Sequence, residues 1–364
     1  MSRRGDRDRG VPPSGGSAGA STPASRRTVS ARPPSDATRA DVAPGRADTF
    51  FGRPRSEASD PVPPVDVLLS GAPYDAGVLA RPGARLAPRA VREASLGFGG
   101  YSDALGISVW DEIRAADGGD VASGPGAPGA VLETIARRSE AVARSGVIGG
   151  WVGGDQTITL GVLRGIHRAK LKSVAMVHID ASTDALGPAG SVDLHHQSVL
   201  RHAAEEGLVR PDAVIQVGVR GPHHSEEEPQ RSIARGFEVV KIDDVKWDVH
   251  SAVSQIRKIV RQGSLYVSVD ISALDPAYAP GASVPRPGGM NTWELQQILR
   301  ALVGAHIVGF DVVEVSPPYD PAGITALAAA SALYELLAVI ADTHRSARPA
   351  PSSAGRRRGR RFSP

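Results

Sequence analysis

Short hydrophobic runs alternate with segments of helical periodicity through the middle of this chain. Seven of the runs are continuously apolar and rich in β-branched residues: 65–73, 146–154, 173–180, 213–221, 237–243, 264–272 and 306–318. A continuous apolar run of this length, without a polar face, is typical of a strand that is covered on both sides. We therefore expect a sheet that is buried between two layers.

The segments between these runs have apolar residues at helical spacing and predict helices. They cover residues 87–99, 130–146, 157–170, 198–209, 251–263, 292–304 and 324–344. Strands joined by single helices favour right-handed crossovers and a parallel sheet. The predicted fold class is therefore α/β, with three α/β/α layers around a central, mostly parallel sheet. In such a sheet the functional site lies at the carboxyl ends of the strands.

Both ends of the chain differ from this middle part in composition. Residues 1–47 are rich in Ser, Pro, Gly and Arg and have almost no large apolar side chains, which predicts disorder. Residues 346–364 have the same character, which leaves 48–345 as one α/β domain. The second tail adds an arginine cluster at Arg356, Arg357, Arg358, Arg360 and Arg361. Such a cluster can contact nucleic acid or acidic lipid, but we favour a solvated tail because no aromatic stacking residues accompany it.

Composition excludes several kinds of chemistry. With no cysteine among 364 residues, the chain has no disulfide, no Cys-ligated zinc and no Cys nucleophile. The N-terminal sequence lacks the apolar segment of a signal peptide, and we find no apolar run long enough to span a bilayer. We expect a soluble, cytoplasmic protein without a membrane partner. A formal net charge of +3 is too small to imply a nucleic-acid partner.

Acidic residues follow several of the predicted strands. The run 146–154 leads into Asp155 and Gln156, the next ends at Asp180, a later one carries Asp270, and the last contains Glu314. A single Asp at a strand end is often only a helix cap or a turn residue. Several carboxylates at one edge of a sheet would repel one another unless a cation lies among them or some are protonated. The sequence thus indicates a candidate cation site.

Several motifs in this order resemble the agmatinase and arginase group of ureohydrolases over roughly residues 48–343. They are "PYDAGVLARPGARLAPRAVREAS", "GGDQTIT", "VHIDASTD", "RHAAEEGLVRP", "VGVRG", "SVDISALDPAYAPGASVPRPGG" and "DVVEVSPPYD". The resemblance implies two manganese ions that share a hydroxide, which attacks a guanidinium carbon and releases urea. The family's ligands are a His after Gly-Gly-Asp, the Asp, His and Asp of Asp-Ala-His-x-Asp, and two Asp of Asp-x-Asp.

Three of these six ligand positions are changed in this chain. Matching residues remain at Asp180, Asp184 and Asp270, whereas the other positions hold Gln156, Ser182 and Ser272. Amide and hydroxyl oxygens are poor ligands for a transition metal. One of the two ions would keep three carboxylates with Gln156 as a weak fourth ligand, and the other would lose both of its private ligands. We expect no full dinuclear manganese site, and at most one divalent ion, either Mn or a hard cation such as Mg or Ca.

The resemblance also implies roles for other residues. Glu314 matches the acid that faces the substrate guanidinium, and a carboxylate suits that planar donor. Asp184 matches a residue that also hydrogen-bonds the nucleophile. His196 matches a proton-shuttling His, although His195 leaves the register uncertain by one and both could be polar loop residues. His178 matches a common His that is not a ligand, so we leave it out of the site.

Three functions remain open from the sequence. The leading hypothesis is a repurposed or inactive ureohydrolase homologue, a pseudoenzyme that binds a guanidino or amine ligand. The alternative is an active amidinohydrolase, which hydrolyses the C–N bond of a linear amidine such as agmatine or guanidinobutyrate with one metal. The third is a nucleic-acid or membrane-associated protein that acts through its Arg-rich tails. The resemblance further implies a homo-oligomer.

Overall fold

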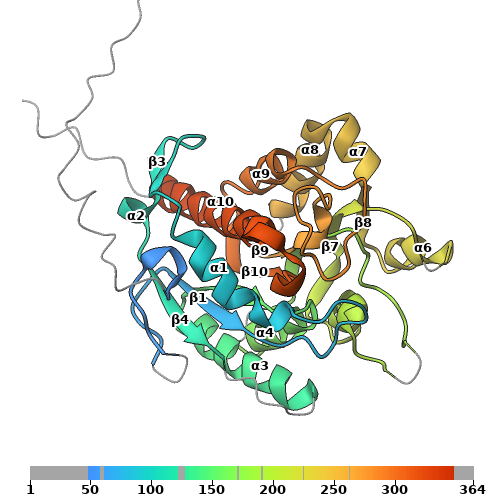
Figure 1. The fold of residues 1–364 in the computed structure, drawn as a ribbon, viewed down its shortest axis with the longest axis horizontal. Coiled ribbons are helices and arrows are strands. Elements are labelled where there is room, and N and C mark those ends of the chain that lie inside the picture. Colours follow the sequence, from blue (N-terminus) through green and yellow to red (C-terminus); the bar gives the residue numbers. More distant parts are fainter. Residues whose placement is uncertain are drawn as a thin grey trace, which may run out of the picture. The chain divides into compact units, whose positions relative to one another are not determined.

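The computed structural model describes residues 48–57, 61–121, 128–169, 172–189, 192–223, 225–261 and 263–347. Within these ranges the centre of the fold is one eight-stranded sheet in the order β4-β1-β5-β10-β9-β6-β7-β8, and each neighbouring pair runs parallel (Figure 1). Its strands are β1 (Val67–Ala72), β4 (Ala115–Asp120), β5 (Ile148–Gly153), β6 (Val174–Ile179), β7 (Val209–Val219), β8 (Glu238–Lys241), β9 (Ser264–Asp270) and β10 (His306–Val313). The sheet confirms the predicted fold class.

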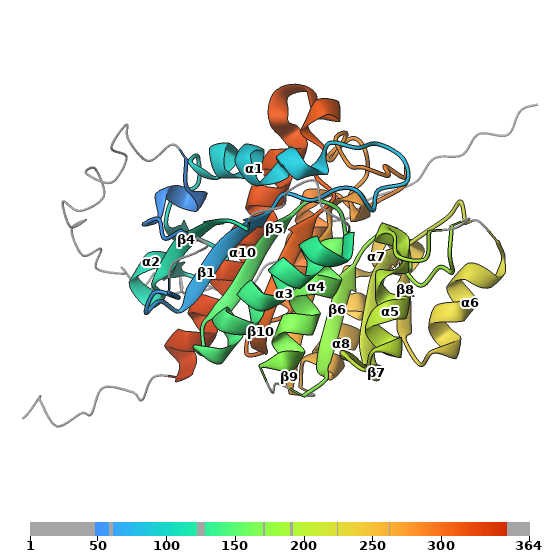
Figure 2. The same cartoon turned by 90° about the horizontal axis from the view of Figure 1, so that it is seen from below.

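Helices cover both faces of the sheet, as its continuous apolar strands require (Figure 2). One face packs against α1 (Ala87–Ser95), α2 (Val109–Glu112), α7 (Ile242–Trp247), α8 (Val249–Val260), α9 (Thr292–Arg300) and α10 (Ile324–Ala347). The other packs against α3 (Pro128–Arg144), α4 (Thr157–Arg168) and α5 (Val199–Glu205), while α6 (Glu227–Ala234) contacts β8. Each predicted helix has its counterpart among these.

The elements that the sequence did not predict have little apolar periodicity. Strand β4 reads "AADGGD", and a short hairpin joins β2 (Tyr101–Ser102) to β3 (Ile107–Ser108). Strand β4 is fixed by its neighbour: it pairs with β1 from Val67–Ala115 to Leu69–Asp117, and the register shifts before Gly71. Strand β10 ends at Val313, earlier than predicted, because the backbone turns at Glu314.

Helix α10 requires a correction to the expectation that no segment could span a bilayer. In the part of the chain that the structure describes, Pro321–Ala347 is long and apolar enough by length and composition, with a mean hydropathy of 1.9. However, 83% of the apolar 18-residue stretch within it is buried inside the protein. Its apolar character is therefore that of a core helix, and it ends at Ala347, two residues beyond the predicted domain boundary at 345.

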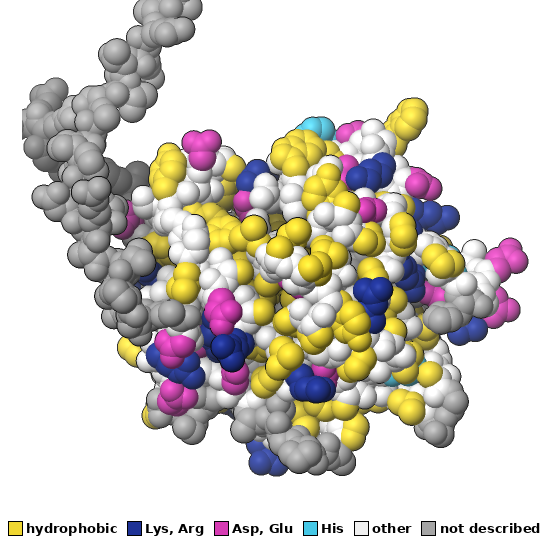
Figure 3. Space-filling view, viewed as in Figure 1, with side chains coloured by type: hydrophobic (Ala, Val, Ile, Leu, Met, Phe, Trp, Pro, Cys, Tyr) yellow, Lys and Arg dark blue, Asp and Glu magenta, His cyan; other side chains and the backbone are white. Residues whose placement is uncertain are grey.

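Charged side chains of both signs are interspersed on the face of the molecule drawn in Figure 3. Several exposed charged side chains among the described residues form ion pairs within a helix, such as Arg89 with Glu93 in α1 and Arg137 with Glu133 in α3. An extended strip of one sign, which nucleic-acid binding would favour, is not visible on the described part of this face. The predicted arginine cluster at 356–361 lies outside the described residues.

Candidate active site

Four carboxylates meet at the carboxyl edge of the sheet. Asp180 directly follows β6, Asp270 ends β9, Glu314 directly follows β10, and Asp184 lies in the loop after β6. These strands are neighbours in the sheet, so residues that lie far apart in the sequence come together. All four side chains are buried, with at most 5% exposure. The structure thus places the predicted acidic residues in one enclosed site.

The carboxylates in this cluster disfavour one another's charge. Burial, followed by the charge of Asp184, raises the pKa of Asp180 to about 7. Burial, followed by the charge of Asp180, raises the pKa of Asp270 well above its ordinary value. Like charges in a water-poor site have this effect unless a cation compensates them. The cluster therefore favours a cationic occupant.

Two site residues have a strained backbone. Asp184 and Glu314 have positive φ angles of 47° and 67°, which side chains other than Gly and Asn rarely adopt. Backbone hydrogen bonds hold them there: the amide of Glu314 donates to the Gly154 carbonyl at 2.9 Å, and the Asp184 carbonyl accepts from the Leu200 amide at 2.9 Å. Such conformations cost about 1–3 kcal/mol each and are concentrated at functional sites.

His196 pairs with Glu314. Its Nδ1 lies 3.0 Å from Glu314 Oε1, which also accepts the Gln156 backbone amide at 2.7 Å. Burial alone would lower the pKa of His196, but the charge of Glu314 raises it to about 9. His195 instead directs Nε2 to the Gly187 carbonyl at 2.9 Å. The geometry thus places His196 rather than His195 against the predicted guanidinium-binding acid.

The orientation of the Gln156 amide is fixed by a buried network below the carboxylates. Asp311 accepts hydrogen bonds from the hydroxyls of Thr159 at 2.7 Å, Ser268 at 2.6 Å and Tyr266 at 2.5 Å. Thr159 and Ser268 each have one hydroxyl proton, so their oxygens are left as acceptors, and Gln156 Nε2 donates to both at 2.9 Å. The Gln156 Oε1 atom is buried and lacks a hydrogen-bond partner among the described residues.

The two serines do not replace the metal ligands that the family resemblance implies. Ser272 Oγ donates a hydrogen bond to Asp180 Oδ1 at 2.8 Å, so it contacts a carboxylate and does not supply the one that the family has at this position. Ser182 Oγ accepts the Asp184 amide at 3.4 Å. Neutral hydroxyls of this kind bind transition metals weakly. The side chains present therefore do not fit a pair of manganese ions.

His178 belongs to the site, although the motif positions did not predict it. It lies two residues before Asp180 on β6, so both side chains point to the same face of the sheet. Its Nε2 atom is 3.6 Å from Asp180 Oδ2 and 3.6 Å from Asp184 Oδ2, and the three side chains form a buried group of metal-binding type. The i, i+2 spacing to a strand-end Asp was the signal that could have identified it.

Other acids near the site have structural roles. Asp155 accepts the backbone amides of Gly77 and Thr157, both at 2.8 Å, and so ties the loop after β1 to the start of α4. Asp275 accepts the amides of Ala277 at 2.9 Å and Gly288 at 2.7 Å, which fixes the loop after β9. Their carboxylates are engaged with the backbone and serve to shape the loops around the cluster.

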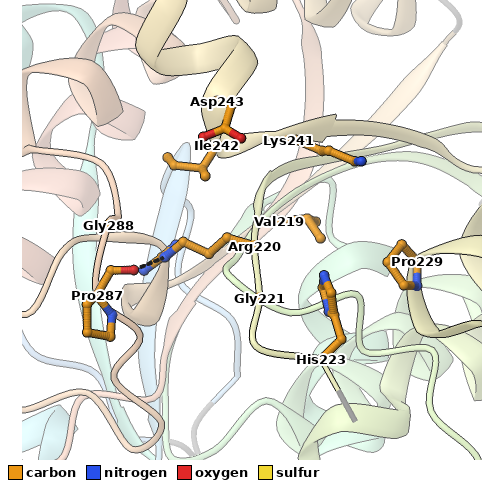
Figure 4. A pocket seen from close by; sticks show the side chains of 10 residues that line it. All are labelled: Val219, Arg220, Gly221, His223, Pro229, Lys241, Ile242, Asp243, Pro287 and Gly288. Carbon is orange, nitrogen blue, oxygen red and sulfur yellow. Dashed lines mark hydrogen bonds between the residues drawn. The ribbon is translucent and has the colours of Figure 1, made fainter. Parts of the chain in front are cut away.

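A cavity of about 410 Å³ lies at the carboxyl ends of β7 and β8 (Figure 4). Its inner wall includes Arg220, whose guanidinium donates to several backbone carbonyls, among them Ser272 at 2.8 Å and Arg286 at 2.6 Å. Lys241 and His223 also line this cavity. Arg220 is consequently committed to holding loops together, including the one that follows Asp270.

Comparisons with known proteins agree with this architecture. A model of the arginase family matches residues 65–339. A guanidinobutyrase of Pseudomonas aeruginosa is 34% identical over 298 residues, which cover 81% of this chain and 93% of that protein. The proclavaminate amidinohydrolase of Streptomyces clavuligerus is 35% identical over 282 residues, 77% of this chain and 90% of that protein.

Solved structures give the same result at the level of the fold. The proclavaminate amidinohydrolase structure superimposes with a TM-score of 0.76 at 35% identity and covers 82% of this chain and 98% of that chain. An arginase from Bacillus caldovelox superimposes with a TM-score of 0.64 at 21% identity, over 75% of this chain and 98% of that chain. The second similarity supports the fold alone.

Proposed function

Because this chain belongs to the arginase family, we propose that its acidic site binds a small guanidino or amine cation and that two-manganese urea release is lost or strongly reduced. Relatives named guanidinobutyrase and proclavaminate amidinohydrolase support a guanidino compound as the ligand class. The observation that carries the proposal is the combination of an intact Glu314–His196 pair with three substituted ligand positions.

Glu314 is the residue we assign to the ligand. Its Oε1 atom is already occupied by His196 and by the Gln156 amide, whereas Oε2 is buried without a hydrogen-bond partner in the described part of the chain. A carboxylate oxygen in that state has a strong requirement for a donor, and a guanidinium or ammonium group supplies one together with a compensating charge. The neighbouring carboxylates at Asp180 and Asp270 add to the attraction.

The loss of hydrolysis follows from the substituted positions. A two-metal site activates water because two cations together lower the pKa of a shared water molecule. In this chain Gln156, Ser182 and Ser272 offer neutral oxygens, and the serine at 272 is engaged with Asp180. We therefore expect the binding of the cationic group to outlast the hydrolytic reaction.

An active amidinohydrolase with one metal is the second candidate. The buried group of His178, Asp180 and Asp184 favours it, because these three side chains retain a set of donors that suits one divalent ion. This candidate differs from the first in that the protein would release urea from its ligand. Action through the Arg-rich tails is a third candidate that concerns residues outside the described part.

We also propose a homo-oligomer in the cytoplasm, which light scattering and fractionation would check.

The test is to measure binding and reaction separately. Purified full-length chain is titrated calorimetrically with agmatine, arginine and guanidinobutyrate, and urea is assayed in parallel with added manganese. We expect at least one of the compounds to bind with little or no urea formed. Urea release at a normal enzymatic rate would refute the loss of hydrolysis, and the absence of binding by all three compounds would refute the assigned ligand class.

Replacing Glu314 by Gln should abolish most of this binding. The substitution keeps the size of the side chain and removes the charge that faces the cation. Loss of one partner of a buried charge pair typically costs about 2–5 kcal/mol, so the dissociation constant should rise by a factor of about 30 or more. Glu93→Gln, on the exposed side of α1, is the matched control and should bind as the parent does. Equal affinities for the two variants would show that the ligand lies elsewhere.

Binding of guanidinobutyrate should strengthen as pH rises toward 9. The negative charge of Glu314 raises the pKa of His196 to about 9, so His196 is protonated at neutral pH in the protein without ligand. A guanidinium at Glu314 favours the neutral imidazole, and the affinity should rise up to about tenfold per pH unit below that pKa and then level off. Calorimetry in two buffers of different ionisation enthalpy measures the proton released.

Matched histidine variants separate this effect from other titrations. His196→Gln should flatten the rise in affinity between about pH 8 and 9, leaving the part that titrates with Asp180 near pH 7, whereas His195→Gln should keep the whole rise, because His195 interacts with the Gly187 carbonyl instead of the carboxylate. An affinity that is constant or falls between pH 7 and 9 would contradict the assignment of His196 to the ligand site.

A further inference from the structure

The side-chain carbonyl oxygen of Gln156 is a buried acceptor that no donor of the described residues satisfies. Gln156 is 0% exposed, and its Oε1 atom has no hydrogen-bond partner among these residues. Its amide nitrogen, in contrast, donates to Thr159 Oγ1 and to Ser268 Oγ, both at 2.9 Å. Burial of an unpaired amide oxygen destabilises a fold, so such an acceptor in an enclosed site indicates a ligand that supplies the donor.

The Gln156 amide cannot be reversed to satisfy that oxygen. The hydroxyl protons of Thr159 and Ser268 both go to Asp311, so each hydroxyl oxygen is left as an acceptor. In the reversed orientation Oε1 would face these two oxygens, and acceptors would meet acceptors. Oε1 is therefore held on the branch of the amide that points away from the two hydroxyls.

A second unpaired acceptor belongs to the neighbouring strand. The Gln156 backbone amide donates to Glu314 Oε1 at 2.7 Å, and the Glu314 amide donates to the Gly154 carbonyl at 2.9 Å. These contacts join the two residues where β5 and β10 end side by side. Glu314 is 1% exposed, and its Oε2 atom also has no partner within the described ranges. The ends of two paired strands thus present one neutral acceptor and one charged acceptor.

The number of unpaired oxygens in the site limits which cation can satisfy them. Within the described ranges, the buried oxygens of the cluster that lack a donor are Gln156 Oε1, Asp180 Oδ2, Asp184 Oδ2 and Glu314 Oε2. A primary ammonium has three N–H groups on one nitrogen, so at least one of these oxygens would stay unpaired. A monosubstituted guanidinium has five N–H groups, which lie in one plane on three nitrogens. The guanidinium is therefore the better match in donor number.

We propose that Gln156 Oε1 accepts a hydrogen bond from the guanidinium group of the ligand, while Glu314 Oε2 accepts another N–H of the same group. Gln156 then makes a direct ligand contact and selects a guanidinium over a primary ammonium on the same carbon chain. The physical reason is that a site with buried acceptors rejects a ligand that leaves one of them unpaired. The role of Gln156 rests on the proposed function, because it requires the cationic group to lie at Glu314.

The first experiment compares two ligands that differ in their cationic group. Full-length protein is titrated calorimetrically with guanidinobutyrate and with 4-aminobutyrate, which has an ammonium in place of the guanidinium. We expect guanidinobutyrate to bind at least about 10-fold more tightly, since a buried acceptor left unpaired costs about that much in affinity. Equal affinities, or tighter binding of 4-aminobutyrate, would overturn the proposal.

A variant without the acceptor tests the assignment to Gln156. Gln156→Met keeps the length of the side chain and removes Oε1, so the preference for guanidinobutyrate over 4-aminobutyrate should fall by about 10-fold. A general disturbance of the site would weaken both compounds alike and leave their ratio unchanged, and that outcome would overturn the proposal.

A second glutamine provides the matched control for this variant. Gln296→Met, at a half-buried position of α9 where the amide donates to Ser331, should keep the preference of the parent. Thermal unfolding identifies a variant that does not fold. Gln156→Leu, which also lacks the oxygen, takes the place of Gln156→Met in that case.

A chelator distinguishes ligand binding from metal binding as the use of this oxygen. After metal is removed, the preference for guanidinobutyrate should be the same, and its loss would mean that Oε1 binds an ion and would overturn the proposal. An unchanged preference in Gln156→Met, with guanidinobutyrate binding lost in Glu314→Gln, would refute the role of Gln156 alone. If neither agmatine, arginine nor guanidinobutyrate binds the parent, the proposed function fails and the role of Gln156 fails with it.

Discussion

Changing Gln156→His, Ser182→His and Ser272→Asp together is expected to produce a chain that binds two manganese ions, where the parent binds at most one. The three positions already lie at the carboxyl edge of the sheet around Asp180 and Asp270, so the substitutions complete the six ligands that the family resemblance implies. Mass spectrometry after manganese loading measures the gain directly. Urea release from guanidinobutyrate should rise with it.

The triple variant should also depend on manganese for its stability. It adds a carboxylate at position 272 to a cluster in which the pKa values of Asp180 and Asp270 are already raised by burial and mutual repulsion. Without metal the added charge destabilises the fold. With manganese at about 100 times its dissociation constant, each bound ion should contribute about 2.7 kcal/mol to the free energy of unfolding.

The control for this experiment is Ser272→Ala, which removes the hydroxyl that donates to Asp180 without adding a ligand. It should leave the metal content unchanged. If the triple variant folds and still takes up no manganese, the correspondence between these three positions and the family's ligands is wrong. Thermal unfolding with and without manganese separates that outcome from misfolding.

Arg92→Met is expected to destabilise the fold by about 3–5 kcal/mol. Arg92 is 5% exposed and forms a two-pronged ion pair with Asp117, from Nε at 2.8 Å and from Nη2 at 3.0 Å, while Nη1 contacts Asp120 at 2.6 Å. Asp117 is fully buried, so removal of its partner leaves an uncompensated charge in the interior. The midpoint of urea unfolding, followed by circular dichroism, measures the loss.

Arg89→Met, on the same helix, is the matched control. Arg89 pairs with Glu93 at 3.0 Å on the surface, with side-chain exposures of 87% and 59%, and an exposed pair of this kind contributes at most about 0.5 kcal/mol. Similar losses for the two variants would mean that the buried pair between α1 and β4 is not what anchors the edge of the sheet.

A strand of this fold can be predicted from the sequence only where its residues have a hydrophobic pattern. Strand β6 is recognisable because both of its faces are buried, so five of its six residues are apolar. Strand β4 was not recognised because "AADGGD" has no apolar run; the pairing with β1 and the interaction of Asp117 with Arg92 hold it in the sheet. These are contacts between segments far apart in the chain.

In the site, too, some features could be predicted from the sequence and others could not. The motifs identified Asp180, Asp270 and Glu314 by residue type and by their positions at the ends of strands. They did not reveal that His178 approaches two of the acids to 3.6 Å, nor that His196 rather than His195 meets Glu314. Which of two adjacent histidines points inward depends on the conformation of the loop, and the residue types alone are the same in either register.

The sequence by itself determined the α/β class, the family resemblance, the acidic edge and the three altered ligand positions, because each depends on local periodicity or on residue identity at a motif position. Only the tertiary structure decided how the altered side chains are used. Gln156 directs its amide group toward Thr159 and Ser268 because those hydroxyls give their protons to Asp311. Hydrogen-bond direction and the distance between buried charges depend on groups brought together from different strands, and the order of residues along one strand does not contain that information.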